Sequence, residues 1–539
     1  MSASRVALAL LSVATGARAI AFTWQPGIAS LFDDSVSYLV MAQAFSPWHA
    51  TSAPIAAAFP AEKYPPLFPL LVAIGGGAYD WRVAHAWVAV SFAAGIFLLG
   101  LHARDITKSG AVGFAAALVF AWMPGMWLNV KGILSEFPYI ALVLAALLQY
   151  RATCSRPTRV RYVVFGLLVA GVVLTRTIGI TLVAAIVIVE ALQWIRSRDR
   201  ARLMHAAITL GAAMAIVAAW YLLRPRGGED AYVAFGTGMA RGTVEHGTEW
   251  TLGLMAHNIS ALVDAWLTAL LIFWGEPWKP GFLIACVVGA SAVAGTLWRA
   301  WQLEADAIYV IAFAAILVAW PFPGQMYRLA LPAMPLLVAN AFWLWMRVAQ
   351  RVAPPDRAGR WSALAALVPL TLCVPAVLFY IVERARLPGK EVAAGYRVAD
   401  IAEFYRIPPR PAAEANALLE IGVLADFDAI QRSTPPTARI MWYLPGYVAL
   451  LAQREGVALE RPTELAGLAA QLAARKPDYV YLSSVHPRDT AHRDGDPMDA
   501  LPFMRERGDE VWRRANAAGI AESVLLKIDP ARVPETIAK

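Results

Sequence analysis

Long apolar segments separated by short polar connections fill residues 1–383 of the chain. A helix that crosses a bilayer needs about 20 mostly apolar residues. On that rule we expect spans near residues 6–24, 83–101, 111–128, 137–150, 162–175, 178–195, 203–223, 281–298, 307–321, 329–346 and 361–382. Residues 66–78 and 258–274 are apolar but interrupted or poorly flanked, so they are short, re-entrant or interfacial helices or additional spans. The pattern predicts an α-helical polytopic membrane protein with about 11 transmembrane helices, in a range of about 11 to 13.

The connection after the first span, residues 31–70, predicts juxtamembrane helices in an external loop. It opens on Asp33 and Asp34 and ends near Tyr64, Pro65 and Pro66. The apolar run before it also has features of a signal peptide, namely an early arginine and small residues. We expect a retained first helix, because the two aspartates follow at once and further spans come after them.

Residues 384–539 have a different pattern, without any apolar run of about 20 residues. Helical patterns alternate there with short strand-like runs, which is typical of an α/β domain. The expected helices are Glu414–Leu424 and Glu464–Arg475, and the expected strands are Ala438–Tyr443, Asp478–Leu482 and Ser523–Ile528. The sequence therefore predicts a membrane domain at 1–383 and a small C-terminal α/β domain at 384–539.

Composition agrees with a membrane protein, since 59% of the residues are hydrophobic and 16% are charged. Soluble domains have about 45–50% apolar and about 25% charged residues. The formal net charge of +8 would indicate nucleic acid in a soluble protein, but basic loops of a membrane protein account for it. We therefore expect the lipid bilayer, and no nucleic acid, as a partner. None of the three cysteines lies in 384–539, so no disulfide framework is available there.

Basic connections orient the predicted spans, because Lys and Arg concentrate in cytoplasmic loops. These connections carry Arg104 and Lys108; Arg151, Arg156, Arg159 and Arg161; Arg196, Arg198, Arg200 and Arg202; Arg299; and Arg347, Arg351, Arg357 and Arg360. Alternation then places residues 33–62, 129–136, 175–177, 224–258 and 321–328 outside. An odd number of spans also puts the C-terminal domain outside. We expect a multi-pass protein of a bacterial inner membrane, with its chemistry on the extracytoplasmic face.

Acidic residues on that face are candidates for catalysis. Asp34 is the first choice and Asp33 the second, because a carboxylate orients or deprotonates a hydroxyl or binds a divalent cation. The alternative for either is a helix N-cap. Glu136 follows Ser135 at the outer end of a span and is a candidate partner of Asp34. Its alternative is an ordinary helix start with Pro138 in the first turn.

Arginines on the same face run against the charge bias, so they require anionic partners. Phosphate is a natural partner, since the guanidinium group matches its oxygens bidentately. We expect Arg328, next to Tyr327, and Arg176 to bind phosphate; the alternative is an arginine that extends to the interface. The loop 224–258 adds Arg241 as a further phosphate ligand. It also adds His246, which is either solvated or a metal ligand together with Asp34 and Glu136.

These motifs together resemble those of the GT-C membrane glycosyltransferases, which use polyprenyl-phosphate sugars and include protein O-mannosyltransferases and lipid A aminoarabinose transferases. The resembling elements are Asp34–Tyr38 with the small-residue helix after it, Tyr64-Pro65-Pro66, Ser135-Glu136, Thr175-Arg176 and Tyr327–Pro332. They occur in the family's order over about residues 5–350. The pair Asp33-Asp34 replaces the more frequent Asp-Glu, which leaves the catalytic aspartate open between the two. No histidine precedes the two prolines, so a protein acceptor is not assigned.

The resemblance implies a GT-C-type fold and transfer with inversion at the anomeric carbon of the sugar. The acceptor hydroxyl attacks while polyprenyl phosphate leaves. Asp34 would position the hydroxyl, and Arg328, Arg176 or a divalent cation would neutralise the leaving phosphate. No cofactor is certain, and family members differ in their need for a metal. The implied partners are a polyprenyl-phosphate sugar and an envelope acceptor, which is a lipid, a polysaccharide or a protein.

A transporter or flippase of a lipid-linked or amphiphilic solute is the alternative function. The interrupted segment Leu67–Gly77 is similar to the discontinuous helices of transporters. However, the ionisable residues gather on one face instead of near the midplane, and the sequence has no inverted repeat. The sequence therefore favours an enzyme.

Overall fold

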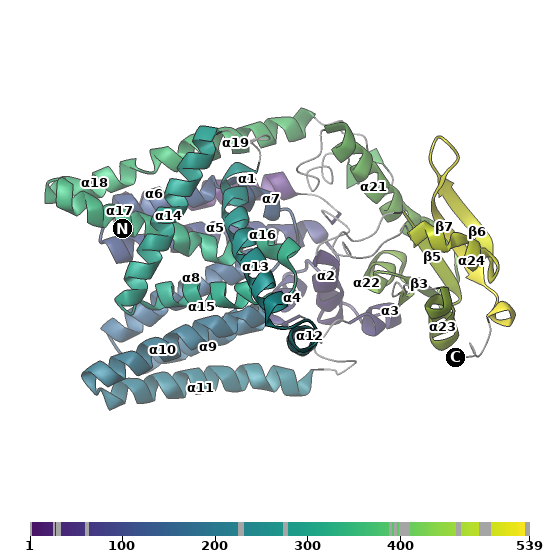
Figure 1. Ribbon diagram of the computed structural model, residues 1–539, viewed down its shortest axis with the longest axis horizontal. Coiled ribbons are helices and arrows are strands. Elements are labelled where there is room, and N and C mark those ends of the chain that lie inside the picture. The colour runs from purple at the N-terminus through teal and green to yellow at the C-terminus, as the bar shows by residue number, and fades with distance from the viewer. Residues whose placement is uncertain are drawn as a thin grey trace. The chain divides into compact units, whose positions relative to one another are not determined.

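The computed structural model describes residues 3–24, 27–28, 34–59, 64–224, 231–272, 279–386, 391–392, 396–397, 410–459, 465–484 and 497–533. The chain forms two compact units, whose elements are labelled in Figure 1. The first unit comprises Met1–Trp24, Ala61–Phe68 and His85–Glu383. The second comprises Gln25–Pro60, Pro69–Ala84 and Arg384–Lys539.

The first unit is helical. Its helices are α1 (Ala3–Thr23), α5 (Trp81–Thr107, with its first residues in the second unit), α6 (Gly110–Ala121), α7 (Pro124–Asn129), α8 (Glu136–Ser155), α9 (Arg159–Thr175), α10 (Ile180–Ser197), α11 (Arg200–Leu223), α12 (Ala231–His246), α13 (Thr248–Leu271), α14 (Lys279–Trp301), α15 (Ala305–Val318), α16 (Met326–Leu329), α17 (Met334–Val352), α18 (Pro355–Leu364) and α19 (Leu367–Arg386). Within the described ranges, nine helical segments are long and apolar enough to cross a membrane, and α6 and α15 are shorter apolar helices. The polytopic fold is confirmed, whereas the number of about 11 spans is not.

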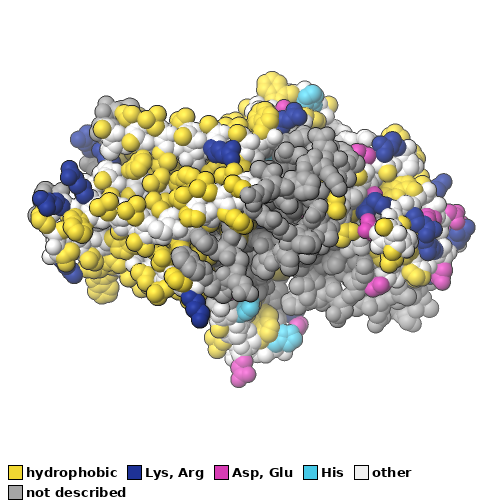
Figure 2. Space-filling view, turned by 90° about the horizontal axis from the view of Figure 1, so that it is seen from above, with side chains coloured by type: hydrophobic (Ala, Val, Ile, Leu, Met, Phe, Trp, Pro, Cys, Tyr) yellow, Lys and Arg dark blue, Asp and Glu magenta, His cyan; other side chains and the backbone are white. Residues whose placement is uncertain are grey.

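The surface of this unit is suited to lipid. Many large apolar side chains on its helices are exposed, such as Leu167 at 57% and Leu283 at 65%. Figure 2 shows a broad hydrophobic surface on the helical part, with several Lys and Arg side chains at its left edge. A membrane span exposes apolar side chains because its solvent is hydrocarbon.

The predicted span 111–128 is wrong as one continuous helix, because α6 ends at Ala121 and α7 begins at Pro124. Proline has no N–H to continue the helical hydrogen bonds, and its ring clashes with the preceding turn. The indole nitrogen of Trp127 donates to the carbonyl oxygen of Ala121 at 2.8 Å and satisfies one carbonyl at the break. The helix break therefore lies in a buried aromatic region, in which Trp127 also contacts Phe92.

The connection 224–258, predicted as an external loop, is helical over residues 231–246 and 248–258, which lie in α12 and α13. Helix α13 is a candidate membrane span. Asn258 lies fully buried in α13, and its amide donates to the carbonyl oxygens of Val318 and Trp320 at 2.8 and 2.7 Å. The polar residue that was predicted to end a loop is thus paired with two carbonyl groups at and just after the C-terminal end of α15.

The second unit contains a five-stranded sheet in the order β4-β3-β5-β7-β6. The strands are β3 (Arg439–Trp442), β4 (Glu455–Ala458), β5 (Tyr479–Ser483), β6 (Gly508–Ala515) and β7 (Ala521–Ile528). Strand β3 pairs in parallel with β4 and β5, whereas β7 pairs antiparallel with β5 and β6. A two-stranded antiparallel pair, β1 (Glu391–Val392) and β2 (Tyr396–Arg397), precedes it. The three predicted strands correspond to β3, β5 and β7.

Helices cover both faces of this sheet. They are α21 (Arg410–Ser433), the short α22 (Pro445–Tyr447) with the π-helical turn Val448–Ala452, α23 (Leu465–Arg475) and α24 (Leu501–Arg505). Leu472 and Met504 pack with Met441, Val480 and Leu526 in one core. On the other face, aromatic side chains of β3 and β5 contact Phe427 of α21. The predicted α/β character of the C-terminal region is confirmed.

Part of the predicted external loop belongs to this second unit. Helices α2 (Ser35–Ala44) and α3 (Ala53–Ala57) pack on the π-helical turn, and they also contact α22 and β4, respectively. Eight of the ten residues of α2 are buried. The apolar stretch 66–78 is a short helix, α4 (Leu67–Ile74). The division at residue 383 stays a prediction, since residues 25–60 and 69–84 are grouped with the C-terminal region.

Candidate functional site

One buried carboxylate holds two arginines together in the helical unit. Oε1 of Glu136 lies 2.6 Å from Nη1 of Arg176 and 3.0 Å from Nε of Arg328. The Glu136 side chain is 1% exposed, whereas those of Arg176 and Arg328 are 13% and 25% exposed. A carboxylate that is removed from water requires charged or hydrogen-bonded partners. The three residues therefore form a single unit, which we call the Arg–Glu–Arg cluster.

Helix ends bring these three side chains together from segments far apart in the sequence. Glu136 is the first residue of α8, and Arg328 lies in the four-residue helix α16. Arg176 follows α9 in an extended conformation (φ −149°, ψ 131°) before the 3-10 turn Thr177–Gly179. An extended residue between two helices turns its side chain out of the helical stack. The prediction that Glu136, Arg176 and Arg328 share one face is consistent with these contacts.

Polar groups surround the cluster. Nη1 of Arg176 lies 3.3 Å from Oγ of Ser135, which is fully buried and makes no side-chain capping bond. The Asn129 amide donates to the hydroxyl of Tyr327, and also to the carbonyl oxygen of Gly125 at 2.8 Å. Tyr327, the neighbour of Arg328, is thus fixed to α7.

Sequence reasoning did not assign Asn129 or Lys131 to the site, although both are buried, at 8% and 1% exposure. Asn129 is the last residue of α7, and Lys131 lies in the segment between α7 and α8 that leads into Glu136. A signal was present in the sequence, because an asparagine and a lysine within an apolar stretch are expensive to bury without partners.

Asp34 lies at the N-cap position of α2, in the second unit, and is partly buried. Its side chain makes no capping hydrogen bond, so the alternative of an ordinary N-cap is not supported. Tyr38 is buried in the next turn of α2, at 4% exposure. Asp33, the second candidate, lies outside the described residues.

Tyr64, Pro65 and Pro66 belong to the first unit and are all buried directly before α4. Two prolines cannot donate backbone hydrogen bonds, and each restricts the residue before it to extended conformations. The motif is therefore a rigid entry to α4, as expected of the end of a loop.

Arg241 and His246 are exposed on α12, and neither contacts Glu136. The structure thus does not bring these two predicted ligands to the Arg–Glu–Arg cluster. Among the residues with described positions, no three His, Cys, Asp or Glu side chains gather as a metal site requires. Glu136 is also held by two cations, so the described residues do not fit the predicted divalent cation.

Solved structures share this architecture over nearly its full length. The crystal structure of ArnT from Cupriavidus metallidurans in the apo state matches with a TM-score of 0.52 and 11% identity, covering 97% of this chain and 98% of that one. The structure of the same protein bound to undecaprenyl phosphate matches with a TM-score of 0.51 and 14% identity, covering 98% of both chains. No family model matches the sequence, and no curated protein matches it. At such low identity the likeness concerns the fold alone: the chain has the fold of ArnT.

Proposed function

We propose that the chain is an inverting glycosyltransferase. It moves a sugar from a polyprenyl-phosphate donor to an envelope acceptor on the extracytoplasmic face of a bacterial inner membrane. The observation that carries this proposal is the Arg–Glu–Arg cluster, in which Arg176 and Arg328 converge on one buried carboxylate. One of the two structural neighbours has undecaprenyl phosphate bound, which supports a polyprenyl phosphate as the donor lipid.

In this proposal the two arginines stabilise the leaving phosphate. As the bond between the anomeric carbon and the phosphate oxygen breaks, negative charge grows on the phosphate. Guanidinium groups that are already in position stabilise such charge without reorganisation at the moment of reaction. Glu136 is then a positioning residue, because its single oxygen Oε1 contacts both arginines. This role replaces the catalytic role that the sequence predicted for Glu136.

Asp34 acts on the acceptor in this proposal. Its carboxylate accepts the proton of the acceptor hydroxyl, whose oxygen forms the new bond to the anomeric carbon opposite the leaving phosphate. The position of Asp34 at the start of α2, in the segment Asp34–Tyr38 that resembles the GT-C motif, supports this role. A carboxylate with a nearby hydroxyl contributes about 10²–10⁴-fold as a general base.

The proposal is tested with the purified full-length protein in detergent. Cells with and without the protein are compared by mass spectrometry of envelope lipids and glycans, which identifies the acceptor. Transfer from a radiolabelled polyprenyl-phosphate sugar to that acceptor is then measured for wild type, Arg176→Gln and Arg328→Gln. Arg241→Gln, which removes an exposed arginine of α12, is the matched control.

Both cluster variants should lose most of the transfer activity, and the control should keep it. Transfer in detergent also separates the enzyme from a transporter, because transport requires a sealed compartment. Full activity of both Arg176→Gln and Arg328→Gln would contradict the assigned phosphate site. If the protein changes the distribution of lipids but forms no new covalent product, the proposed glycosyltransferase activity is contradicted.

A further inference from the structure

A second polar site lies at the end of the helical unit where the basic connections gather. A pocket of about 910 Å³ opens there, lined by residues of α1, α5, α8, α10 and α11 and of the segment leading into α15. Its wall contains five cationic and three carboxylate side chains. None of them belongs to the Arg–Glu–Arg cluster, so this pocket is distinct from the phosphate site proposed above.

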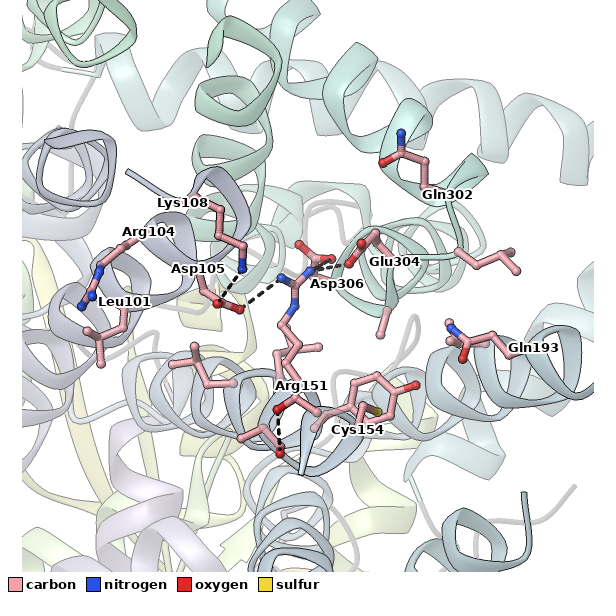
Figure 3. Close-up of a pocket in the computed structure, with 18 of the residues that line it drawn as sticks. Leu101, Arg104, Asp105, Lys108, Arg151, Cys154, Gln193, Gln302, Glu304 and Asp306 are labelled. Carbon is pink, nitrogen blue, oxygen red and sulfur yellow. Dashed lines mark hydrogen bonds and ion pairs between the residues drawn. The ribbon is translucent and has the colours of Figure 1, made fainter. Parts of the chain in front are cut away.

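The carboxylates of this pocket are paired within the protein. Nη1 of Arg151 lies 3.3 Å from Asp105, and its Nη2 contacts Glu304. Asp306 is paired with the buried Arg299, which does not line the pocket and whose Nη2 lies 2.7 Å from Oδ1 of Asp306. Figure 3 shows Arg151 between Asp105 and Glu304, with dashed lines marking these pairs. The acidic side chains of the wall are therefore already neutralised.

The five cations of the wall differ in their pairing with described carboxylates. Lys108 and Arg202 lie 3.2 and 2.8 Å from carboxylate oxygens. Arg5 and Arg104, in contrast, form no ion pair with any residue that the structure describes. Figure 3 shows the guanidinium group of Arg104 directed away from Asp105. The pocket therefore carries excess positive charge on these two arginines.

Close packing fixes the position of Arg104. A Cβ atom at Gly113 of α6 would lie 2.8 Å from Cβ of Arg104 and 2.5 Å from the carbonyl oxygen of Gly100, so only glycine allows this approach of α5 and α6. Helix α1, which carries Arg5 in its first turns, also packs on α6. Helix α6 is thus packed against both α1 and α5, and this packing holds Arg5 and Arg104 at the same pocket.

An apolar stripe begins next to Arg5. Val6, Leu10 and Val13 follow one another at helical spacing on α1 and are 44%, 65% and 69% exposed. Because α1 is a candidate membrane span, this stripe is suited to contact with acyl chains. We propose that Arg5 and Arg104 bind the phosphate of an anionic phospholipid, whose acyl chains lie along the exposed stripe of α1. Basic pockets between helices bind lipid headgroups in this way.

Lipid binding to the delipidated full-length protein in detergent tests this proposal. Native mass spectrometry measures binding of phosphatidylglycerol, phosphatidylcholine and inorganic phosphate. The variants are Arg5→Gln/Arg104→Gln and the charge-preserving Arg5→Lys/Arg104→Lys. Arg159→Gln/Arg200→Gln removes two exposed arginines from the same basic end outside the pocket and is the matched control.

Phosphatidylglycerol should bind wild type in preference to phosphatidylcholine, and the glutamine double variant should bind it about 30-fold more weakly, at about 1 kcal/mol for each arginine. The control and the lysine variant should retain most of the binding; the lysine variant also shows that a loss reflects charge and not misfolding. Equal weakening in the control, or equal binding of phosphatidylcholine, would overturn the proposal. Binding of inorganic phosphate as tight as that of the lipid would also overturn it, since the site would then take a soluble anion.

Discussion

Removal of the Glu136 carboxylate is the sharpest test of how the candidate site works. Glu136→Gln keeps the size of the side chain but leaves Arg176 and Arg328 close together without their shared anion. Loss of one partner of a buried ion pair costs about 3–5 kcal/mol. Because both arginines remain partly exposed and can be hydrated, we expect a loss of about 3 kcal/mol in the free energy of unfolding.

The same change should lower catalysis by misplacing the arginines. A displacement of about 1 Å in a positioning group costs roughly 100-fold in rate, so we expect kcat to fall about 100-fold while KM changes less. Glu136→Asp, which is one methylene shorter, should recover part of kcat, because it still provides the negative charge. The assays are transfer of the labelled sugar and thermal unfolding followed by tryptophan fluorescence.

Glu245→Gln is the control, since it removes an exposed carboxylate of α12. It should change neither kcat nor the unfolding temperature. Unchanged kcat in Glu136→Gln would refute the positioning role, even if the protein were less stable. A variant that loses stability in proportion to activity, without any recovery in Glu136→Asp, would assign Glu136 a purely structural role.

Three further changes test the second unit. Asp34→Asn should lower transfer at least 100-fold, as loss of a general base does, with an unchanged unfolding temperature by tryptophan fluorescence; retained activity would exclude Asp34 as the base. Gly446→Leu should destabilise the protein by about 1–3 kcal/mol in thermal unfolding. Even a Cβ atom at this position would lie 3.3 Å from Cγ1 of Val36 on α2. An unchanged unfolding midpoint would contradict this packing. Burial, and next the charge of Asp426, raise the pKa of Tyr481 well above its usual value. The unfolded chain therefore loses this proton first, so stability should fall as pH rises above about 10, and chemical unfolding of Tyr481→Phe should show a weaker decline.

Hydropathy predicted the membrane fold well because the bilayer imposes one length and one composition on every span. It predicted α13 poorly, since Asn258 and Asp264 interrupt the apolar run of that helix. Asn258 is acceptable there because its amide donates to two carbonyl groups of a neighbouring segment. Such pairing is a tertiary contact, and no local pattern in the sequence reports it.

The C-terminal sheet shows the same limit in a different form. Strands β3, β5 and β7 were predicted because they are interior strands with buried apolar runs. The missed strands β4 and β6 are the two edges of the sheet. Edge strands are bordered on one side only, and β6 in particular is exposed along most of its length. Their sequences therefore lack the apolar pattern by which a strand is recognised.

The cluster itself was predictable in its members but not in its chemistry. Charge orientation placed Glu136, Arg176 and Arg328 on one face, and it suggested separate roles for the acid and the bases. The contacts instead join them through one carboxylate oxygen. Buried ion pairs contribute little net stability compared with apolar packing, although they are strongly destabilising when broken. A buried carboxylate between two arginines is therefore better explained by the geometry it imposes on them than by stability, and in the proposed reaction that geometry would direct both arginines at the departing phosphate.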